Sequence, residues 1–199
     1  MEKEQLAPGI WSYSNVLENP AEFISDIEGL VEIKNLQWFE ANSNNGDVAD
    51  TMVQKSIRDC WNISIPPYDK HPEIRDQGGA LPLLHDYLNA GLLPVFKNYC
   101  AEHGAFHWGE NEGWQLLKYG SGHHFVNHYD DSKQYPRTIS TSYYLNDDYE
   151  GGEIEFPRFG LKIKPKANQM IMFPANYVYN HTVHKVTSGL RYAVVGWWN

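Results

Sequence analysis

The chain has 199 residues, of which 42% are hydrophobic, which is enough for a packed core and argues against global disorder. Its formal charge of −9 argues against a nucleic-acid backbone as the main partner. Two cysteines are too few for a disulfide scaffold, no stretch approaches the ~18 apolar residues of a membrane span, and no apolar run typical of a signal peptide opens the chain. We therefore expect a reduced, cytoplasmic protein that binds neither nucleic acid nor membrane.

Two helical patterns occupy the first half of the chain. Asn19 and Pro20 predict a helix start, and apolar residues at helical spacing follow over residues 23–31. A second helical pattern covers residues 80–101, within which Pro94 predicts a kink or an interruption.

Two loops are predicted between these helices. Residues 41–50, "ANSNNGDVAD", are rich in turn-forming residues. Residues 56–79 contain "IPPY", "HPE" and "QGG" and predict a long irregular segment. Loops of that length are often functional, so the second one is a candidate to cover a binding site.

After about residue 113 the pattern changes to short β-rich runs separated by turns. These runs are "GWQLLKY", "RTISTSYYL", "GEIEF", "LKIKP", "QMIMF" and "RYAVVGWW". Runs of roughly 5–8 residues bounded by Gly, Pro, Asn and Asp are typical of a β-sandwich or jelly roll. We predict one mainly β domain over residues 1–199, in which residues 1–112 supply helical support and loops and residues 113–199 form the β core.

The stretch "NHYDDS" contains a histidine and a carboxylate two positions apart, His128 and Asp130. On a strand, residues i and i+2 project from the same face, so this pair is half of a metal site. The alternative is a structural or surface role, because nine histidines in 199 residues can produce this pattern by chance.

A third ligand must come from another segment, and "YNHTVHKVTSGLRYAVVGWW" offers both His181 and His184. Two histidines and one carboxylate hold Fe(II) and leave positions for an organic chelator and O2. Arg191 lies in the same segment among apolar residues, where it could offer a bidentate fork to the distal carboxylate of a dicarboxylate ligand. The alternative for this arginine is an exposed charge or an ion pair.

The three motifs together resemble the prolyl 4-hydroxylase group of Fe(II)- and 2-oxoglutarate-dependent dioxygenases, in its short bacterial and bacteriophage forms. The resemblance runs from about Trp114 to Trp198 and rests on "KYGSGHHFVNHYDDS", "STSYYLNDDYEGGEIEFP" and "HTVHKVTSGLRYAVVGWW". It implies a double-stranded β-helix, or jelly-roll, core buttressed by the N-terminal helices.

The resemblance also assigns the metal ligands. In that family the distal histidine usually precedes the basic residue by nine or ten positions, and His181 is ten before Arg191. The implied ligands are therefore His128, Asp130 and His181. His184 is then a neighbouring group at the surface or beside the ligands.

Three aromatic residues match positions around the family's co-substrate and iron. The resemblance implies that Tyr119 and Tyr144 line the 2-oxoglutarate pocket and that Trp197 lies near the iron. Ordinary packing is the alternative for each of them. The segment from Gly151 to Glu153 is predicted to be a turn without chemistry of its own.

The resemblance implies Fe(II) as cofactor, 2-oxoglutarate and O2 as co-substrates, and ascorbate as a candidate reductant. Succinate and CO2 would be released as a substrate C–H bond is hydroxylated. The expected substrate is a prolyl residue in a peptide or protein, and the alternative is a free amino acid or small metabolite. Trp61, Tyr68 and Arg75 in the long predicted loop are candidate substrate contacts.

Two readings from other classes remain open. A zinc hydrolase could use the same three ligands and a water, but it would leave Arg191 without a task. A non-catalytic jelly-roll binding protein would account for the aromatic residues, but not for the ligands and the arginine together.

Overall fold

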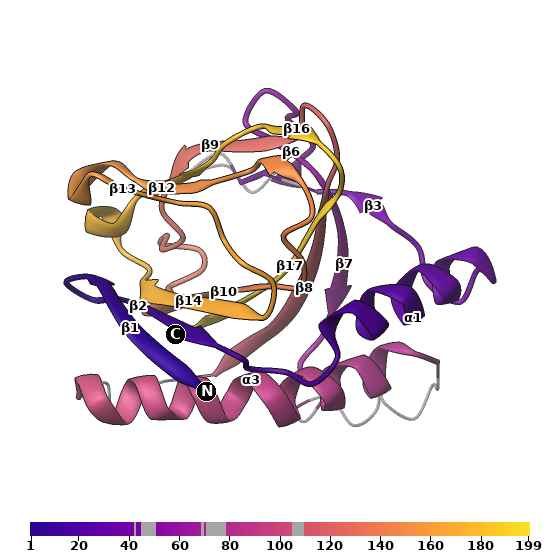
Figure 1. The fold of residues 1–199 in the computed structure, drawn as a ribbon, viewed down its shortest axis with the longest axis horizontal. Coiled ribbons are helices and arrows are strands. Elements are labelled where there is room, and N and C mark those ends of the chain that lie inside the picture. Colours follow the sequence, from indigo (N-terminus) through magenta and orange to yellow (C-terminus); the bar gives the residue numbers. More distant parts are fainter. Residues whose placement is uncertain (42, 45–50, 69, 71–78, 105–109) are drawn as a thin grey trace.

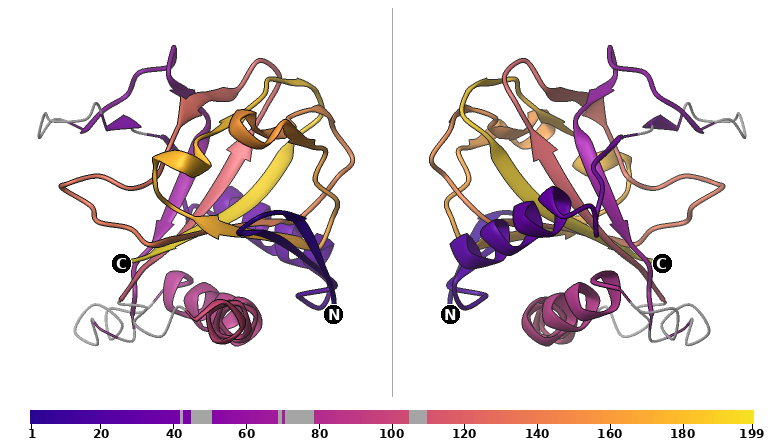
Figure 2. Two further views of the ribbon diagram at one scale, coloured as in Figure 1. Left: turned by 90° about the vertical axis from the view of Figure 1, so that its left-hand side faces the viewer. Right: turned by 90° about the vertical axis from the view of Figure 1, so that its right-hand side faces the viewer.

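Two antiparallel β-sheets face each other, and two helices cover the outer face of the larger sheet (Figures 1 and 2). The structure is a computed structural model, and it describes residues 1–41, 43–44, 51–68, 70, 79–104 and 110–199. Within these residues, no helix is long and apolar enough to cross a membrane.

The larger sheet has eight strands and carries most of the core. In spatial order they are β1 (Glu2–Ala7), β2 (Ile10–Ser14), β14 (Gln169–Pro174), β10 (Ile139–Tyr144), β17 (Arg191–Trp198), β8 (Asn111–Tyr119), β7 (Trp61–Ile65) and β3 (Phe39–Glu40). The sheet therefore joins strands from both ends of the chain, and β17 lies near its centre.

The smaller sheet closes the other side of the molecule. Its strands are β13 (Leu161–Ile163), β12 (Ile154–Phe156), β15 (His181–Val183), β9 (His124–His128) and β6 (Arg58–Asp59). Two short pairs complete the described strands: β11 (Glu150–Gly151) with β16 (Val186–Ser188), and β4 (Ser43–Asn44) with β5 (Thr51–Met52). Of two 3-10 turns, η1 (Pro157–Phe159) connects β12 to β13 within the smaller sheet, and η2 (Tyr177–Tyr179) connects β14 of the larger sheet to β15 of the smaller one. All six β runs expected after residue 113 form strands, so the predicted mainly β fold with N-terminal helices is confirmed.

Both expected helices are present, α1 (Pro20–Glu32) and α3 (Leu81–His103). Asn19 occupies the predicted N-cap position before α1, with a positive φ of 50°, but its side chain makes no capping hydrogen bond. Of the kink or interruption predicted at Pro94, the interruption does not occur, because α3 runs through this residue. Pro94 and Ala90 are both exposed, so water can satisfy the Ala90 carbonyl that the proline leaves without a donor.

The alternation of side chains along β17 explains why there are separate cores on the two faces of the larger sheet. Tyr192, Val194 and Trp198 belong to the cluster that packs under the helices, where the Trp198 ring stacks on Phe96 of α3 at 3.8 Å. Ala193 belongs instead to a second cluster between the two sheets. Since strand residues alternate between faces, Arg191 and Trp197 project toward the space between the sheets.

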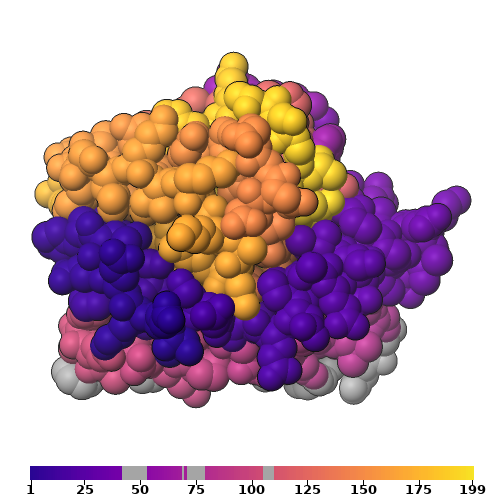
Figure 3. All heavy atoms as spheres, in the orientation of Figure 1, coloured from indigo at the N-terminus to yellow at the C-terminus, as the bar shows by residue number. Residues whose placement is uncertain are grey.

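The first half of the chain contributes more strands than expected. The predicted irregular segment 56–79 contains β6 and β7, and β7 buries Ile63 and Ile65 while Ser64 is exposed. This is ordinary strand alternation, which the neighbouring prolines obscured. The N-terminal strands and α1 lie between α3 and the C-terminal half in the space-filling view (Figure 3). Residues 45–50 of the other predicted loop lie outside the described residues, and its residues 43–44 form β4.

Candidate functional site

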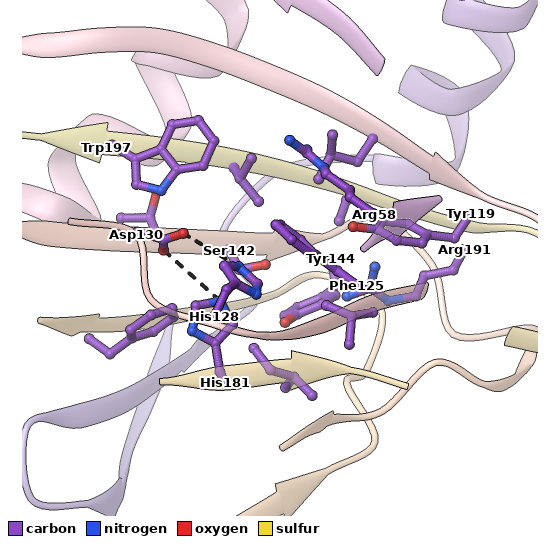
Figure 4. A pocket seen from close by; sticks show the side chains of 17 residues that line it. Arg58, Tyr119, Phe125, His128, Asp130, Ser142, Tyr144, His181, Arg191 and Trp197 are labelled. Atoms are coloured by element: carbon purple, nitrogen blue, oxygen red, sulfur yellow. Dashed lines mark ion pairs between the residues drawn. The ribbon is translucent and has the colours of Figure 1, made fainter. Parts of the chain in front are cut away.

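Three ligand-type side chains converge between the sheets (Figure 4). His128 ends β9, Asp130 follows two residues later, and His181 begins β15, which pairs with β9 at His128. Their ligand atoms all lie within 4.8 Å of one another, and no other described residues form such a group. The Nε2 atom of His128 is 3.6 Å from Asp130 Oδ1, and Nε2 of His181 is 4.0 Å from Asp130 Oδ2. The structure therefore brings together the three predicted ligands, although Asp130 lies just beyond the strand.

The hydrogen bonds of the two imidazoles prepare them to bind a metal. Nδ1 of His128 lies 2.8 Å from the Val126 carbonyl, and Nδ1 of His181 lies 3.1 Å from the Tyr179 carbonyl. A carbonyl only accepts, so each Nδ1 carries the proton and each Nε2 keeps a lone pair facing Asp130.

The protonation states of the triad suit a divalent cation. Burial and the neighbouring His128 lower the pKa of His181 to about 4, so its ring is neutral at neutral pH. Burial alone would raise the pKa of the Asp130 carboxyl, but the two imidazoles and a serine hydroxyl outweigh it and hold the pKa well below its usual value. Two imidazoles that each offer an Nε2 and one carboxylate, without a thiolate, fit non-haem Fe(II).

Arg191 lies in the same pocket and is 2% exposed. Its guanidinium carbon is 4.8 Å from the ring centre of Tyr119 and 5.0 Å from that of Tyr144. Burial by itself would lower the pKa of Arg191, but nearby tyrosine hydroxyls outweigh it and raise the pKa, so the group is charged. Among the described residues, Arg191 has no carboxylate within 4.0 Å, and neither its Nε nor the Tyr144 hydroxyl makes a hydrogen bond. A buried guanidinium without a carboxylate partner among the described residues, next to a buried hydroxyl without a hydrogen bond, fits a carboxylate ligand.

Gly152 makes room for Arg191 at the end of β11. Its φ is +66°, and a Cβ atom there would lie 3.0 Å from Arg191 Cδ and 3.0 Å from Tyr149 Cε2. This segment was predicted to be a turn without chemistry of its own, but Gly151 ends strand β11, and Gly152 gives Arg191 its place beside the pocket.

The pocket contains about 480 Å³ of empty space, counting its open mouth. Its walls include all seven residues predicted for the site: His128, Asp130, His181, Arg191, Tyr119, Tyr144 and Trp197.

Of the other residues considered from the sequence, His184 lies outside the triad. Its Nε2 is 2.5 Å from Glu155 Oε2, so it forms an ion pair or hydrogen bond of its own. Tyr68 is buried in the core beneath α3, with its ring 5.7 Å from His85, so it cannot contact substrate as predicted. Trp61 packs against His123 with ring centres 4.4 Å apart and does not line the pocket. Arg75 lies outside the described residues.

Arg58 and Phe125 line the pocket but were missed from the sequence. Phe125 stacks on His128 with ring centres 3.5 Å apart, and the Arg58 guanidinium lies 5.1 Å from the Phe125 ring. Pairing of β6 with β9 places Arg58 opposite Phe125. Regular strand alternation would place Phe125, three residues before His128, on the opposite face, and an irregularity in the β9–β15 pairing brings the two together. Nothing local in the sequence therefore indicated either Phe125 or Arg58.

Comparisons with known proteins agree with this arrangement. The family model described as the 2OG-Fe(II) oxygenase superfamily matches residues 114–199. A PKHD-type hydroxylase of Pseudomonas fluorescens is 34% identical over 197 residues, covering 92% of this chain and 77% of the relative. Prolyl 3-hydroxylase 2 of Homo sapiens is 42% identical over 66 residues, and this match spans 31% of this chain but only 9% of that protein's length.

Solved structures are similar over almost the whole chain. A Trichoplax adhaerens prolyl hydroxylase in complex with a peptide fragment of hypoxia inducible factor aligns with a TM-score of 0.71 and 19% identity, covering 96% of this chain and 83% of that one. A Pseudomonas putida prolyl-4-hydroxylase aligns with a TM-score of 0.60 and 18% identity, covering 96% of this chain and 92% of that one. At such identities the likeness establishes the fold, a double-stranded β-helix.

Proposed function

The chain belongs to the 2OG-Fe(II) oxygenase superfamily, and we propose that it is an Fe(II)- and 2-oxoglutarate-dependent dioxygenase that hydroxylates a substrate C–H bond. One observation supports this most strongly. The three-ligand group and a buried arginine without an acidic partner among the described residues line the same pocket. A zinc hydrolase or a non-catalytic binding protein would have no use for that arginine.

In this proposal His128, Asp130 and His181 hold Fe(II) through Nε2, a carboxylate oxygen and Nε2. When bound, the iron with 2-oxoglutarate and O2 supplies the oxidising chemistry, in which decarboxylation to succinate and CO2 accompanies transfer of one oxygen to the substrate. The chain's own contribution is to orient the ligands and exclude water. The backbone carbonyls that hold the Nδ1 protons set the direction of both imidazoles.

Arg191 binds the distal carboxylate of 2-oxoglutarate in this proposal, and the Tyr144 hydroxyl donates to the same group. Burial raises the pKa of Tyr144, which keeps its hydroxyl protonated and able to donate. Tyr119 covers the guanidinium with its ring, and Trp197 forms part of the wall near Asp130. A charge-assisted pair in such a dry position is strong and discriminates by shape as well as charge.

The proposed substrate is a prolyl residue in a peptide or protein. Relatives and structural neighbours named as prolyl hydroxylases support this choice, and the Trichoplax adhaerens enzyme was solved with a peptide fragment. The alternative is the same chemistry on a free amino acid or small metabolite, because a shared fold and site can serve different substrates. Ascorbate as a reductant and a cytoplasmic location stay predictions.

Two measurements test the proposal. Anaerobic addition of Fe(II) and then 2-oxoglutarate should produce a visible charge-transfer band, which neither a zinc hydrolase nor a binding protein would show. Succinate release should then be screened across proline-containing peptides and free amino acids, and mass spectrometry should find one added oxygen on proline. Oxygen found only on a free amino acid or another side chain would remove the prolyl assignment but keep the dioxygenase. Absence of both the band and succinate would reject the proposal.

A further inference from the structure

Asp130 lies on the segment between β9 and β10, which contains no helix or strand. A ligand on such a segment needs other contacts to hold it within a fraction of an ångström of a productive position. One contact is a backbone hydrogen bond of 3.1 Å from the Asp130 N–H to the Ala175 carbonyl. The buried Ser140 hydroxyl donates to Asp130 Oδ2 at 2.6 Å, which orients the carboxylate.

Arg137 adds a further contact to Asp130 and connects this segment to the larger sheet. Its Nη1 donates to the Asp130 carbonyl at 3.3 Å, and its backbone N–H donates to Asp131 Oδ1 at 3.1 Å. Its Nε and Nη2 donate to the two carboxylate oxygens of Glu112 on β8, at 2.8 and 2.6 Å. The guanidinium also lies 4.0 Å from the ring centre of Trp197 on β17. One side chain therefore contacts Asp130 and two central strands.

We propose that Arg137 is a positioning residue for iron binding, which together with Ser140 holds Asp130 in place as a ligand. This inference rests on the proposed function. Arginine suits the task because its planar group binds Glu112 with two N–H groups while a third reaches the Asp130 carbonyl. A lysine has one ammonium at the end of a flexible stem and cannot make all of these contacts at once.

Lys118, on β8 of the larger sheet, provides a matched control. The side chains of Arg137 and Lys118 are each 16% exposed, and Lys118 pairs with Glu28 at 2.8 Å. Lys118 also lies 5.2 Å from the Trp38 ring centre. Its Glu28 and Trp38 partners belong to the helix side of the sheet, and it does not line the pocket. Lys118→Gln therefore removes a comparably buried, paired charge without touching Asp130.

The experiment measures the dissociation constant of Co(II), an iron substitute, for the full chain without 2-oxoglutarate or substrate. Loss of a group that orients a metal ligand typically weakens metal binding about 10- to 100-fold. We expect a weakening of that size for Arg137→Gln and Ser140→Ala, a smaller one for Arg137→Lys, and none for Lys118→Gln. In an Asp130→Ala background, Arg137→Gln should weaken binding no further, because the ligand that it positions is already gone.

The possible results show whether the inference about Arg137, or that inference and the proposed function together, is wrong. If the unaltered chain binds Co(II) and Arg137→Gln binds it equally well, the inference is wrong and the proposed function stands. A higher KM for substrate with unchanged Co(II) affinity would make Arg137 a substrate contact and overturn the positioning role. If the unaltered chain does not bind Co(II), both proposals fail. If Arg137→Gln does not fold, the Co(II) dissociation constants of Arg137→Lys and Ser140→Ala test the inference instead.

Discussion

Replacement of Arg191 by methionine should separate co-substrate binding from folding. Arg191 is 2% exposed, is charged, and has no acidic partner within the described part of the chain. Burying such a charge opposes folding, and apolar replacement of buried ionic groups is often neutral or stabilising. Methionine keeps much of the apolar stem, so Arg191→Met should leave the free energy of unfolding of the ligand-free protein unchanged or raise it. Binding of 2-oxoglutarate should nevertheless be strongly weakened.

The expected size of the binding defect follows from the proposed carboxylate–guanidinium pair. Truncation of one partner of a buried charged pair costs ~2–5 kcal/mol, which is about 30-fold or more in affinity. At a 2-oxoglutarate concentration of about 100 times Kd, the ligand stabilises the unaltered protein by about 2.7 kcal/mol. A 30-fold weaker variant at that concentration would be stabilised by only about 0.9 kcal/mol. For a chain of this length these values correspond to increases in Tm of roughly 5–11 °C and 2–4 °C.

A thermal-unfolding titration with 2-oxoglutarate, in the presence of Co(II), would measure both effects. Arg158→Met is the control, because Arg158 bonds Asn180 at the surface and does not line the pocket. A full ligand-induced increase in Tm for Arg191→Met would refute the assignment of the arginine to the co-substrate. A large loss of ligand-free stability would show that its charge is compensated in the folded protein, contrary to the argument from burial.

Three further predictions concern the triad and its surroundings. His181→Ala should abolish Co(II) binding in calorimetry, whereas His184→Ala should retain it because His184 pairs with Glu155; the reverse result would contradict the assignment. Gly152→Ala should weaken 2-oxoglutarate binding and lower the free energy of unfolding by about 1–2 kcal/mol, because Gly152 has a positive φ and lies close to Arg191. An unchanged affinity for 2-oxoglutarate in the thermal-unfolding titration would disprove this. Because the pKa of His181 falls to about 4 on folding, the unfolded chain binds more protons between about pH 6.5 and 4, so metal-free stability should decrease as pH falls through this window. Chemical denaturation across that pH range should show a smaller loss of stability for His181→Leu than for the unaltered protein. If the free energy of unfolding depends on pH equally in both proteins, His181 is not the origin of the effect.

Local patterns were sufficient to predict the features that depend on neighbouring residues. The i, i+2 spacing placed His128 and Asp130 together, and the alternation along a strand places Arg191 and Trp197 on the same face of β17. The β17 pattern works because a strand repeats every two residues, whatever it packs against. Asp130 lies two residues beyond the end of β9, so its place beside His128 also depends on the contacts of the following segment. The choice of His181 over His184 depended on the family resemblance, and the structure places His181 within the three-ligand group.

Only the tertiary structure decided which distant segments meet. Arg58 reaches the pocket because β6 pairs with β9, and Arg137 reaches Glu112 and Trp197 because β8 and β17 are neighbours in the larger sheet. In the same way Tyr68, which looked like a loop contact, is buried beneath α3. Strand pairing between remote segments depends on how the whole core packs, and no local period of the sequence records it.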